Sequence, residues 1–153
     1  MQILEATPQT LAQLVQKHDL MQSIEDVIVN VGGQQVFDSH YLPVLERFAD
    51  RAQSVPLQKA AFSYLGGAFC CGVRAATLAV RACDATIFSP TSSAAERLTN
   101  DGQYRWLAYC AALATVYLIA SASVDVVSGE GDQTYRWSND IHLIDWLSPH
   151  KMA

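Results

Sequence analysis

The chain has 153 residues, of which 50% are hydrophobic and 16% are charged, a composition that excludes intrinsic disorder. Its length suits one hydrophobic core, so we expect a single domain over residues 1–153. The formal net charge of -5 argues against non-specific nucleic-acid binding, because neutralising phosphates needs a surplus of Lys and Arg on at least one face.

Two short helices are predicted first. Thr7 followed by Pro8 is typical of a helix N-cap and first helical position, and apolar residues recur at helical spacing over residues 11–15. A second apolar stripe covers residues 20–28. It ends at residues 30–33, where Asn and Gly tolerate left-handed backbone, so we expect the chain to turn there.

A third helix is expected to begin at Asp38 or Ser39, to carry Pro43 in its first turn and to end before Pro56. Its predicted inner face consists of Leu45, Phe48, Ala49 and Ala52.

A fourth helix is expected over about residues 67–85. Its predicted buried stripe consists of Phe69, Val73, Ala76, Val80 and Cys83. Arg74 and Arg81 fall on a different side of this helix.

Residues 88–102 are rich in Ser, Thr and Asn and predict a loop, with a helical turn at most over residues 94–98. A long apolar helix follows over about residues 104–123. The stretch 106–124 lacks any charge and is long enough to cross a membrane, but its Ala, Ser, Thr and Tyr content and the lack of a basic cluster at either end favour a central helix buried all round. We therefore expect no membrane contact.

Residues 128–133 predict an acidic loop, and Ser138 can cap a last helix that Pro149 stops. The fold class is therefore all-α, a compact helical bundle around the apolar helix at about residues 104–123. Residues 1–10 lack the features of a secretory signal. The four cysteines, Cys70, Cys71, Cys83 and Cys110, lack paired CxxC spacing and indicate reduced, buried thiols in a cytoplasmic protein.

Taken together, six segments resemble the HD-hydrolase-like N-terminal domain of MobH-class conjugative relaxases, the helicase or nickase proteins of conjugative plasmids and integrative elements. The resemblance covers about residues 7–147. The segments are LAQLVQKHDLMQSI (11–24), YLPVLERFADRAQSVP (41–56), LGGAFCCGVRAATLAVRAC (65–83), IFSP (87–90), YRWLAYCAALA (104–114) and the closing stretch 137–146. The resemblance implies an HD-like helical fold.

In that family a His-rich triplet, a later His and a His-Asp pair hold a metal. The resemblance places these ligands at the positions of Ala60, Ala61, Phe62, Cys71, Thr115 and Val116. A Gly-Lys pair of the family falls at Leu118 and Ile119. Because an HD-type centre needs His and carboxylate ligands to activate water, we expect no metal, no cofactor and no metal-dependent catalysis. Val116 and Ile119 are expected to make the former pocket wall apolar and to fill it.

His18 and Asp19 spell an HD dipeptide, but they lie far in sequence from any other histidine. We interpret them as surface polar residues near a helix end. A rebuilt site that uses His40, His142 or Cys71 is the alternative, in which case the purified protein would contain a stoichiometric transition metal.

Two arginine pairs share helical faces and are candidates for contact with phosphates: Arg47 with Arg51, and Arg74 with Arg81. Glu46 and Asp50 interleave the first pair, which favours solvated ion pairs. A nucleic-acid-binding module that uses Arg74 and Arg81 therefore remains the second hypothesis, and it requires salt-sensitive binding.

The leading hypothesis is a non-catalytic module in conjugation or mobile-element biology, acting through a protein partner or a homodimer. The high apolar fraction gives such an interface a physical motive, because a small domain cannot bury that much apolar surface by itself. In that family the domain usually forms part of a longer protein. The sequence therefore leaves open whether this chain is a fragment of a longer protein.

Overall fold

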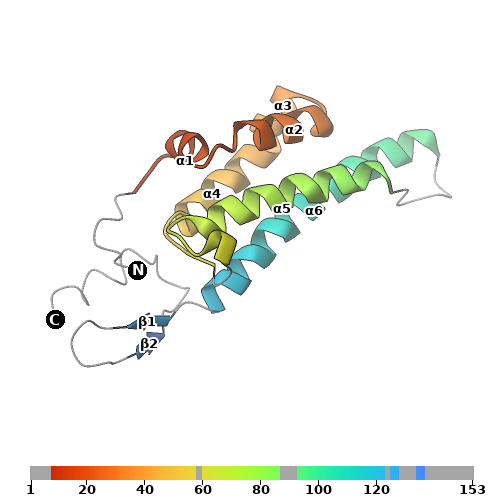
Figure 1. The fold of residues 1–153 in the computed structure, drawn as a ribbon. Helices are drawn as coiled ribbons and strands as arrows, with labels where there is room; N and C mark the ends of the chain where they lie inside the picture. Colours follow the sequence, from red (N-terminus) through yellow and green to blue (C-terminus); the bar gives the residue numbers. More distant parts are fainter. Residues whose placement is uncertain (1–7, 58–59, 87–92, 123–124, 128–133, 137–153) are drawn as a thin grey trace.

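A computed structural model describes residues 8–57, 60–86, 93–122, 125–127 and 134–136 (Figure 1). Its elements, in chain order, are α1 (Leu11–Lys17), α2 (Met21–Val31), α3 (Gln34–Val36), the π-helical turn η1 (Phe37–Tyr41), α4 (Leu42–Ala52), the 3₁₀ turn η2 (Ala60–Phe62), α5 (Gly67–Asp84), α6 (Ala94–Ala122), β1 (Asp125–Val127) and β2 (Thr134–Arg136).

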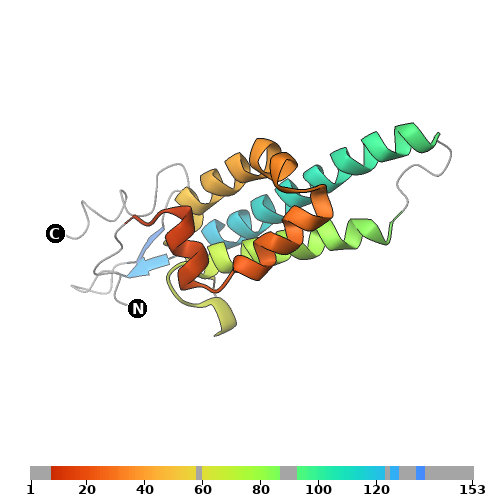
Figure 2. The same ribbon diagram turned by 90° about the horizontal axis from the view of Figure 1, so that it is seen from above.

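The long helices α5 and α6 lie side by side along most of their length, and α4 packs against both of them (Figures 1 and 2). Helix α2 lies across α5, while α1 contacts α4. This arrangement confirms the all-helical class expected for the body of the fold. Beyond α6 the chain adds a short antiparallel pair of strands, in which Val126 of β1 is in register with Tyr135 of β2. The sequence pattern does not predict these strands.

Helix α1 begins at Leu11, not at Pro8, so the predicted N-cap at Thr7 is wrong. Thr10 is the N-cap: its hydroxyl accepts a hydrogen bond from the backbone N–H of Gln13, and the Gln13 side chain accepts one from the backbone N–H of Thr10. This reciprocal pair is a capping box, which satisfies two N–H groups that the first turn leaves unpaired.

Helix α2 ends as predicted at Gly32, whose φ of 105° lies in the left-handed region. The next helix does not begin at Asp38 or Ser39, because a single helical run extends from Gln34 through η1 into α4. Pro43 has no N–H to donate into this run. Just before it, the N–H of Leu42 bonds to the carbonyl of Phe37 five residues back, so the wider π turn accommodates the proline without a break.

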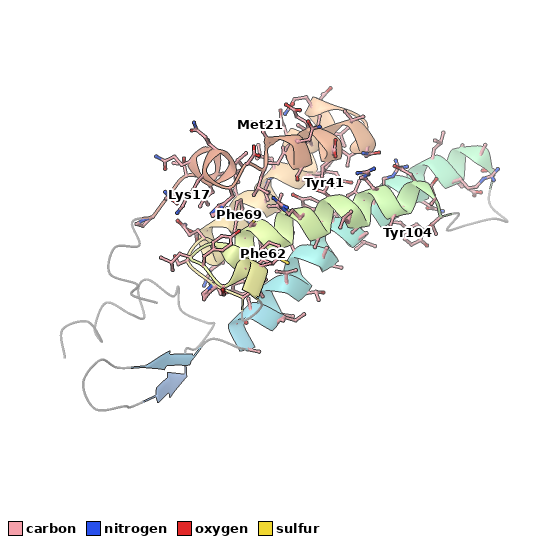
Figure 3. All side chains as sticks on the ribbon, viewed as in Figure 1. Lys17, Met21, Tyr41, Phe62, Phe69 and Tyr104 are labelled. Carbon is pink, nitrogen blue, oxygen red and sulfur yellow. The ribbon has the colours of Figure 1, made fainter. Side chains whose placement is uncertain are left out.

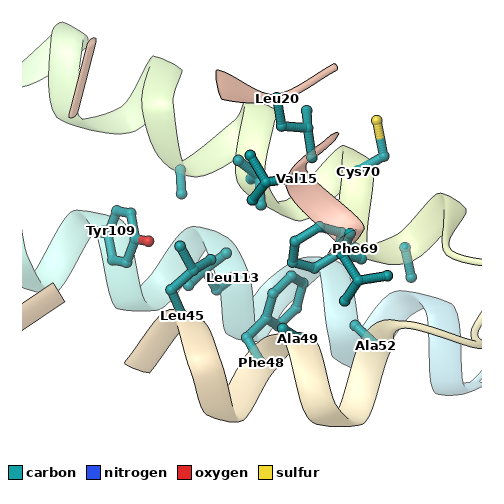
Figure 4. Packing of buried hydrophobic residues seen from close by; sticks show 14 of the residues in the cluster. Val15, Leu20, Leu45, Phe48, Ala49, Ala52, Phe69, Cys70, Tyr109 and Leu113 are labelled. Carbon is teal, nitrogen blue, oxygen red and sulfur yellow. The ribbon is translucent and has the colours of Figure 1, made fainter. Parts of the chain in front are cut away.

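The core is built from the inner faces that the periodicity predicted on α4 and α5. The rings of Phe48 and Phe69 stack across the two helices at 6.1 Å between centroids (Figure 4). Tyr41 meets Tyr109 of α6 edge-to-face at 5.1 Å. The predicted inner residues of these helices are all buried, namely Leu45, Phe48, Ala49, Ala52, Phe69, Val73, Ala76, Val80 and Cys83.

Helix α6 differs most from the expectation. It begins at Ala94, so most of the predicted loop over residues 88–102 is helical where it is described. Ser93 and Glu96 form a second capping box, with Ser93 N–H donating to Glu96 Oε2 at 2.9 Å and Glu96 N–H donating to Ser93 Oγ at 3.3 Å. The hydrogen bonds that the Ser93 N–H and the Ser93 hydroxyl donate to the carboxylate hold the pKa of Glu96 below its usual value.

The expectation that this apolar helix is buried on every side is also wrong. Tyr109, Leu113 and Ala120 form a buried stripe, whereas Leu107 is 53% exposed and Leu118 is 59% exposed. The helix therefore lies at the edge of the described bundle and not at its centre. The predicted helix from Ser138 and the acidic loop at residues 128–133 lie outside the described residues.

The start of α5 provides a test of this packing. A methyl group at Gly67 would overlap the carbonyl of Phe62, which accepts a hydrogen bond from the N–H of Leu57, so Gly67→Ala is expected to destabilise the fold by about 1–3 kcal/mol. Gly102 in α6 is the matched control, because a methyl group there meets nothing within 4 Å. Gly102→Ala should stabilise the protein by up to about 1 kcal/mol, and urea unfolding of both variants measures the difference. Equal stability of the two variants would contradict the packing at η2.

Candidate functional site

The six positions that the resemblance assigns to metal ligands lie on three elements. Ala60, Ala61 and Phe62 form η2, Cys71 lies on α5, and Thr115 and Val116 lie on α6. Among the described residues there is no group of three or more His, Cys, Asp or Glu side chains that could hold a metal ion. Ile119, expected to fill the former pocket, is 57% exposed, so that expectation is wrong for it. Val116 does pack against the core.

His18 is not the surface residue that the sequence suggested. Its ring is half-buried and stacks on Tyr64 at 5.7 Å between centroids, and it also contacts Phe69 at 6.2 Å. A Cβ at Gly66 would lie 2.7 Å from His18 Nε2, so only glycine leaves room for the ring. His18 Nε2 is buried and has no hydrogen-bond partner among the described residues, whereas Asp19 is exposed. Burial, followed by the charge of Lys17, lowers the pKa of His18.

Tyr64 links His18 to the first cysteine of α5. Burial raises the pKa of Tyr64 to about 12, and a hydrogen bond with the Cys70 side chain adds to this shift. A phenol with so high a pKa stays protonated at neutral pH and does not act as a base. The structure therefore brings His18, Tyr64 and Cys70 together, a cluster that the sequence could not indicate because these residues come from separate elements.

The cysteines are free thiols, as expected. Cys70 and Cys83 are buried, but Cys71 and Cys110 are only half-buried. Burial raises the pKa of Cys83 and of Cys110, which disfavours the reactive thiolate form at these two positions.

The four candidate arginines are exposed and have different surroundings. Arg81 faces Asp26 of α2, with 3.9 Å between Nη1 and Oδ2. The charge of Arg74 acts on Tyr64, and that of Arg51 acts on Tyr117 of α6. Arg47 lies on α4 beside the exposed Glu46. Contact of any of them with phosphates stays a prediction.

His40 lies on η1, an element that carries none of the six metal positions. Its backbone carbonyl accepts a hydrogen bond from Trp106 Nε1 at 3.2 Å, and both residues line a pocket together with Arg105. His142, another residue of the alternative rebuilt site, lies outside the described residues. Arg105 donates from Nη2 to Asp84 Oδ1 at 2.6 Å. The sequence had not singled out Arg105, because its partners are separated from it by 21 residues or more.

One side of α6 presents apolar residues to solvent. We call Leu107, Ala111, Ala114 and Leu118 the α6 apolar face; all four are exposed, and their spacing of four, three and four residues places them on one line along the helix. Among the described residues, α6 is the helix that is long and apolar enough to cross a membrane, and 22% of its most apolar window is buried. Most of this window is not buried, so α6 lacks the burial that distinguishes a core helix from a membrane-spanning one.

Comparison with known proteins gives one family. A family model described as "Putative helicase" (TraI_2) matches residues 3–152. No curated protein and no solved structure shows significant similarity to the chain. The family match spans almost the whole sequence and includes η2, α5 and α6.

The lowered pKa of the half-buried His18 makes the stability of the fold depend on pH. Because its pKa in the folded state lies below the ordinary value of 6.5, the unfolded chain takes up this proton more readily than the folded chain. The contribution of His18 to stability is therefore complete above pH 6.5 and is lost as the pH falls from there through the folded-state pKa. Urea unfolding between about pH 8 and pH 5 measures this loss.

Two variants make the assignment specific. His18→Gln should remove this part of the pH dependence. Lys17→Gln should reduce it without abolishing it, because burial is the larger cause of the shift and the Lys17 charge the smaller one. An unchanged pH profile in His18→Gln would show that the loss of stability arises at another group.

Proposed function

The chain belongs to the TraI_2 family of conjugative TraI-type proteins, and we propose that it serves conjugation as a non-catalytic, HD-like module that binds a protein partner. The observation that carries this proposal is the α6 apolar face. We further propose that the chain is a degenerate relative of the MobH-class relaxase domain. This part of the proposal rests on the six resembling segments and on the side chains at the metal positions.

The α6 apolar face has the composition of an interface. Leu107 and Leu118 are 53% and 59% exposed, and between Arg105 and Asp125 the chain carries no charged residue. Burying a leucine side chain contributes about 1.5–3 kcal/mol relative to full exposure, so covering this face is favourable. Contiguous apolar patches on soluble proteins mark interaction sites more often than chance surface.

The side chains at the metal positions support the absence of catalysis. Ala, Phe, Thr and Val lack donor groups suited to hold a divalent ion, and the thiol of Cys71 is a single ligand. Without a bound ion, water keeps its high pKa and supplies no hydroxide for attack on a phosphate ester at neutral pH.

The proposed setting is the cytoplasm, with a protein partner covering α6. A second copy of the chain is the simplest such partner, because a symmetric dimer needs one self-complementary patch and the α6 apolar face carries no charge that would repel a copy of itself. The small side chains of Ala111 and Ala114 between two leucines would let a second helix approach closely.

The α6 apolar face predicts the effect of added charge. Leu118→Glu would place a carboxylate in the proposed interface, so the mass of the native complex should fall to that of the monomer, or the partner should be lost from a pull-down. Val29→Glu is the matched control, because Val29 is 77% exposed on α2 and its replacement should leave the complex intact. A complex that survives Leu118→Glu, or a wild-type protein that floats with liposomes and has no protein partner, would overturn the proposal.

The proposed absence of catalysis is tested by assaying the protein with and without metal ions. Purified protein supplied with manganese should show no phosphodiesterase turnover and should retain no stoichiometric transition metal by elemental analysis. Replacing Phe62 with His alone should not create activity, since a metal centre needs several ligands. Turnover that a chelator abolishes and manganese restores would show that the chain is an enzyme.

A further inference from the structure

A pocket of about 490 Å³ lies where α3 and η1 meet the first half of α6. Its apolar walls come from Val31 and Val36 on one side and from Trp106 and Leu107 on the other. Tyr41, which is buried in the core, also lines the pocket (Tyr41 is labelled in Figure 3). Sites for small ligands usually enclose roughly 300–1,000 Å³ with mostly apolar walls and a few polar groups, and this pocket fits that description.

The pocket is apart from the positions of the lost metal ligands. Phe62 and Tyr104 lie near opposite ends of the α5–α6 pair (Figure 3), and the pocket belongs to the end that carries Tyr104. The two sides of the pocket are joined by a hydrogen bond: Trp106 Nε1 on α6 donates to the backbone carbonyl of His40 on η1 at 3.2 Å. This bond joins two residues that lie 66 positions apart in the chain, so it holds η1 against α6 beside the pocket.

The polar lining carries positive charge and no negative charge. Its polar residues are His40, Thr99, Gln103 and Arg105, and no Asp or Glu lines the pocket. Arg105 pairs through Nη2 with Asp84, but its Nε is buried and has no hydrogen-bond partner in the described part of the chain. A guanidinium with N–H donors left over favours a second acceptor, and a carboxylate gives the strongest such hydrogen bonds.

We propose that this pocket binds a small aromatic carboxylate, with the ring against Trp106 and the two valines and the carboxylate on Arg105. An aromatic ring suits walls formed by an indole, a phenol and branched aliphatic side chains, because such rings pack face-to-edge with one another. The carboxylate supplies an acceptor for N–H groups of Arg105 that Asp84 does not use. This proposal rests on a different observation from the protein contact proposed for the α6 apolar face, although Leu107 belongs to both surfaces.

The probe is 1-naphthylacetate, and its neutral isostere 1-naphthylacetamide is the comparison ligand. Titration is followed by calorimetry and by the indole N–H signal of Trp106 in two-dimensional NMR. The chain has three tryptophans, so Trp106→Phe identifies this signal. We expect one-to-one binding of the acid, a shift of the Trp106 signal, and binding of the amide that is at least about tenfold weaker.

Gly102→Leu is the decisive variant. Gly102 lines the pocket, and a Cβ there meets nothing within 4 Å, so we expect a leucine to occupy pocket space without a clash at its Cβ. Affinity for naphthylacetate should fall at least about tenfold while the thermal midpoint is unchanged or raised. Arg105→Gln should bring the acid and the amide to similar affinities. Arg81→Gln, which removes the ion pair between α5 and Asp26 of α2, should leave both affinities unchanged.

Three results would overturn the proposal: no binding of naphthylacetate at millimolar concentration, equal binding of acid and amide by the wild type, or binding that Gly102→Leu leaves intact. None of these would affect the proposed protein contact, since that is measured by the mass of the native complex with no added ligand.

Discussion

The close approach of α4 to α5 at Gly72 is the constraint on which the remaining packing depends. A Cβ at Gly72 would overlap the ring of Phe48, so the absence of a side chain there lets Phe48 reach α5 and stack on Phe69. These two rings fill the centre of the bundle and fix the distance between the helices. Helix α4 covers one side of α5 through these two rings. Helices α2 and α6 pack on the remaining sides of α5.

The sequence predicts the parts of the fold in which apolar residues recur at helical spacing. The inner faces of α4 and α5 were predicted correctly, because a buried stripe has the same spacing whatever packs against it. The starts of α1 and α6 were missed although their signals are present: Thr10 with Gln13 and Ser93 with Glu96 are both capping-box pairs. The π turn before Pro43 could not be predicted, since a proline is equally compatible with a new helix that begins there.

The candidate sites were less predictable, because they depend on contacts between distant segments. His18 looks like a solvent-facing residue in sequence, and only the folded chain places Tyr64 and Gly66 around its ring. The pocket at Arg105 joins side chains between residues 31 and 41 to residues of α6 that lie at least 58 positions later in the chain. Identities at single positions, such as Ala61 or Val116, can exclude a ligand role from sequence alone, whereas an assembled site can be recognised only in three dimensions.

Helix α6 shows why apolar composition does not by itself indicate burial. A helix that is apolar on every side suggested a central position, yet the described fold buries one stripe, with Tyr109 and Leu113, and exposes Leu107 and Leu118 on the other side. The same hydrophobic effect favours a protein core and an intermolecular interface, so the sequence pattern is identical for both. The geometry distinguishes them: α5 and α4 already occupy one side of α6, and an apolar surface on the other side gains stability only when something outside the described bundle covers it.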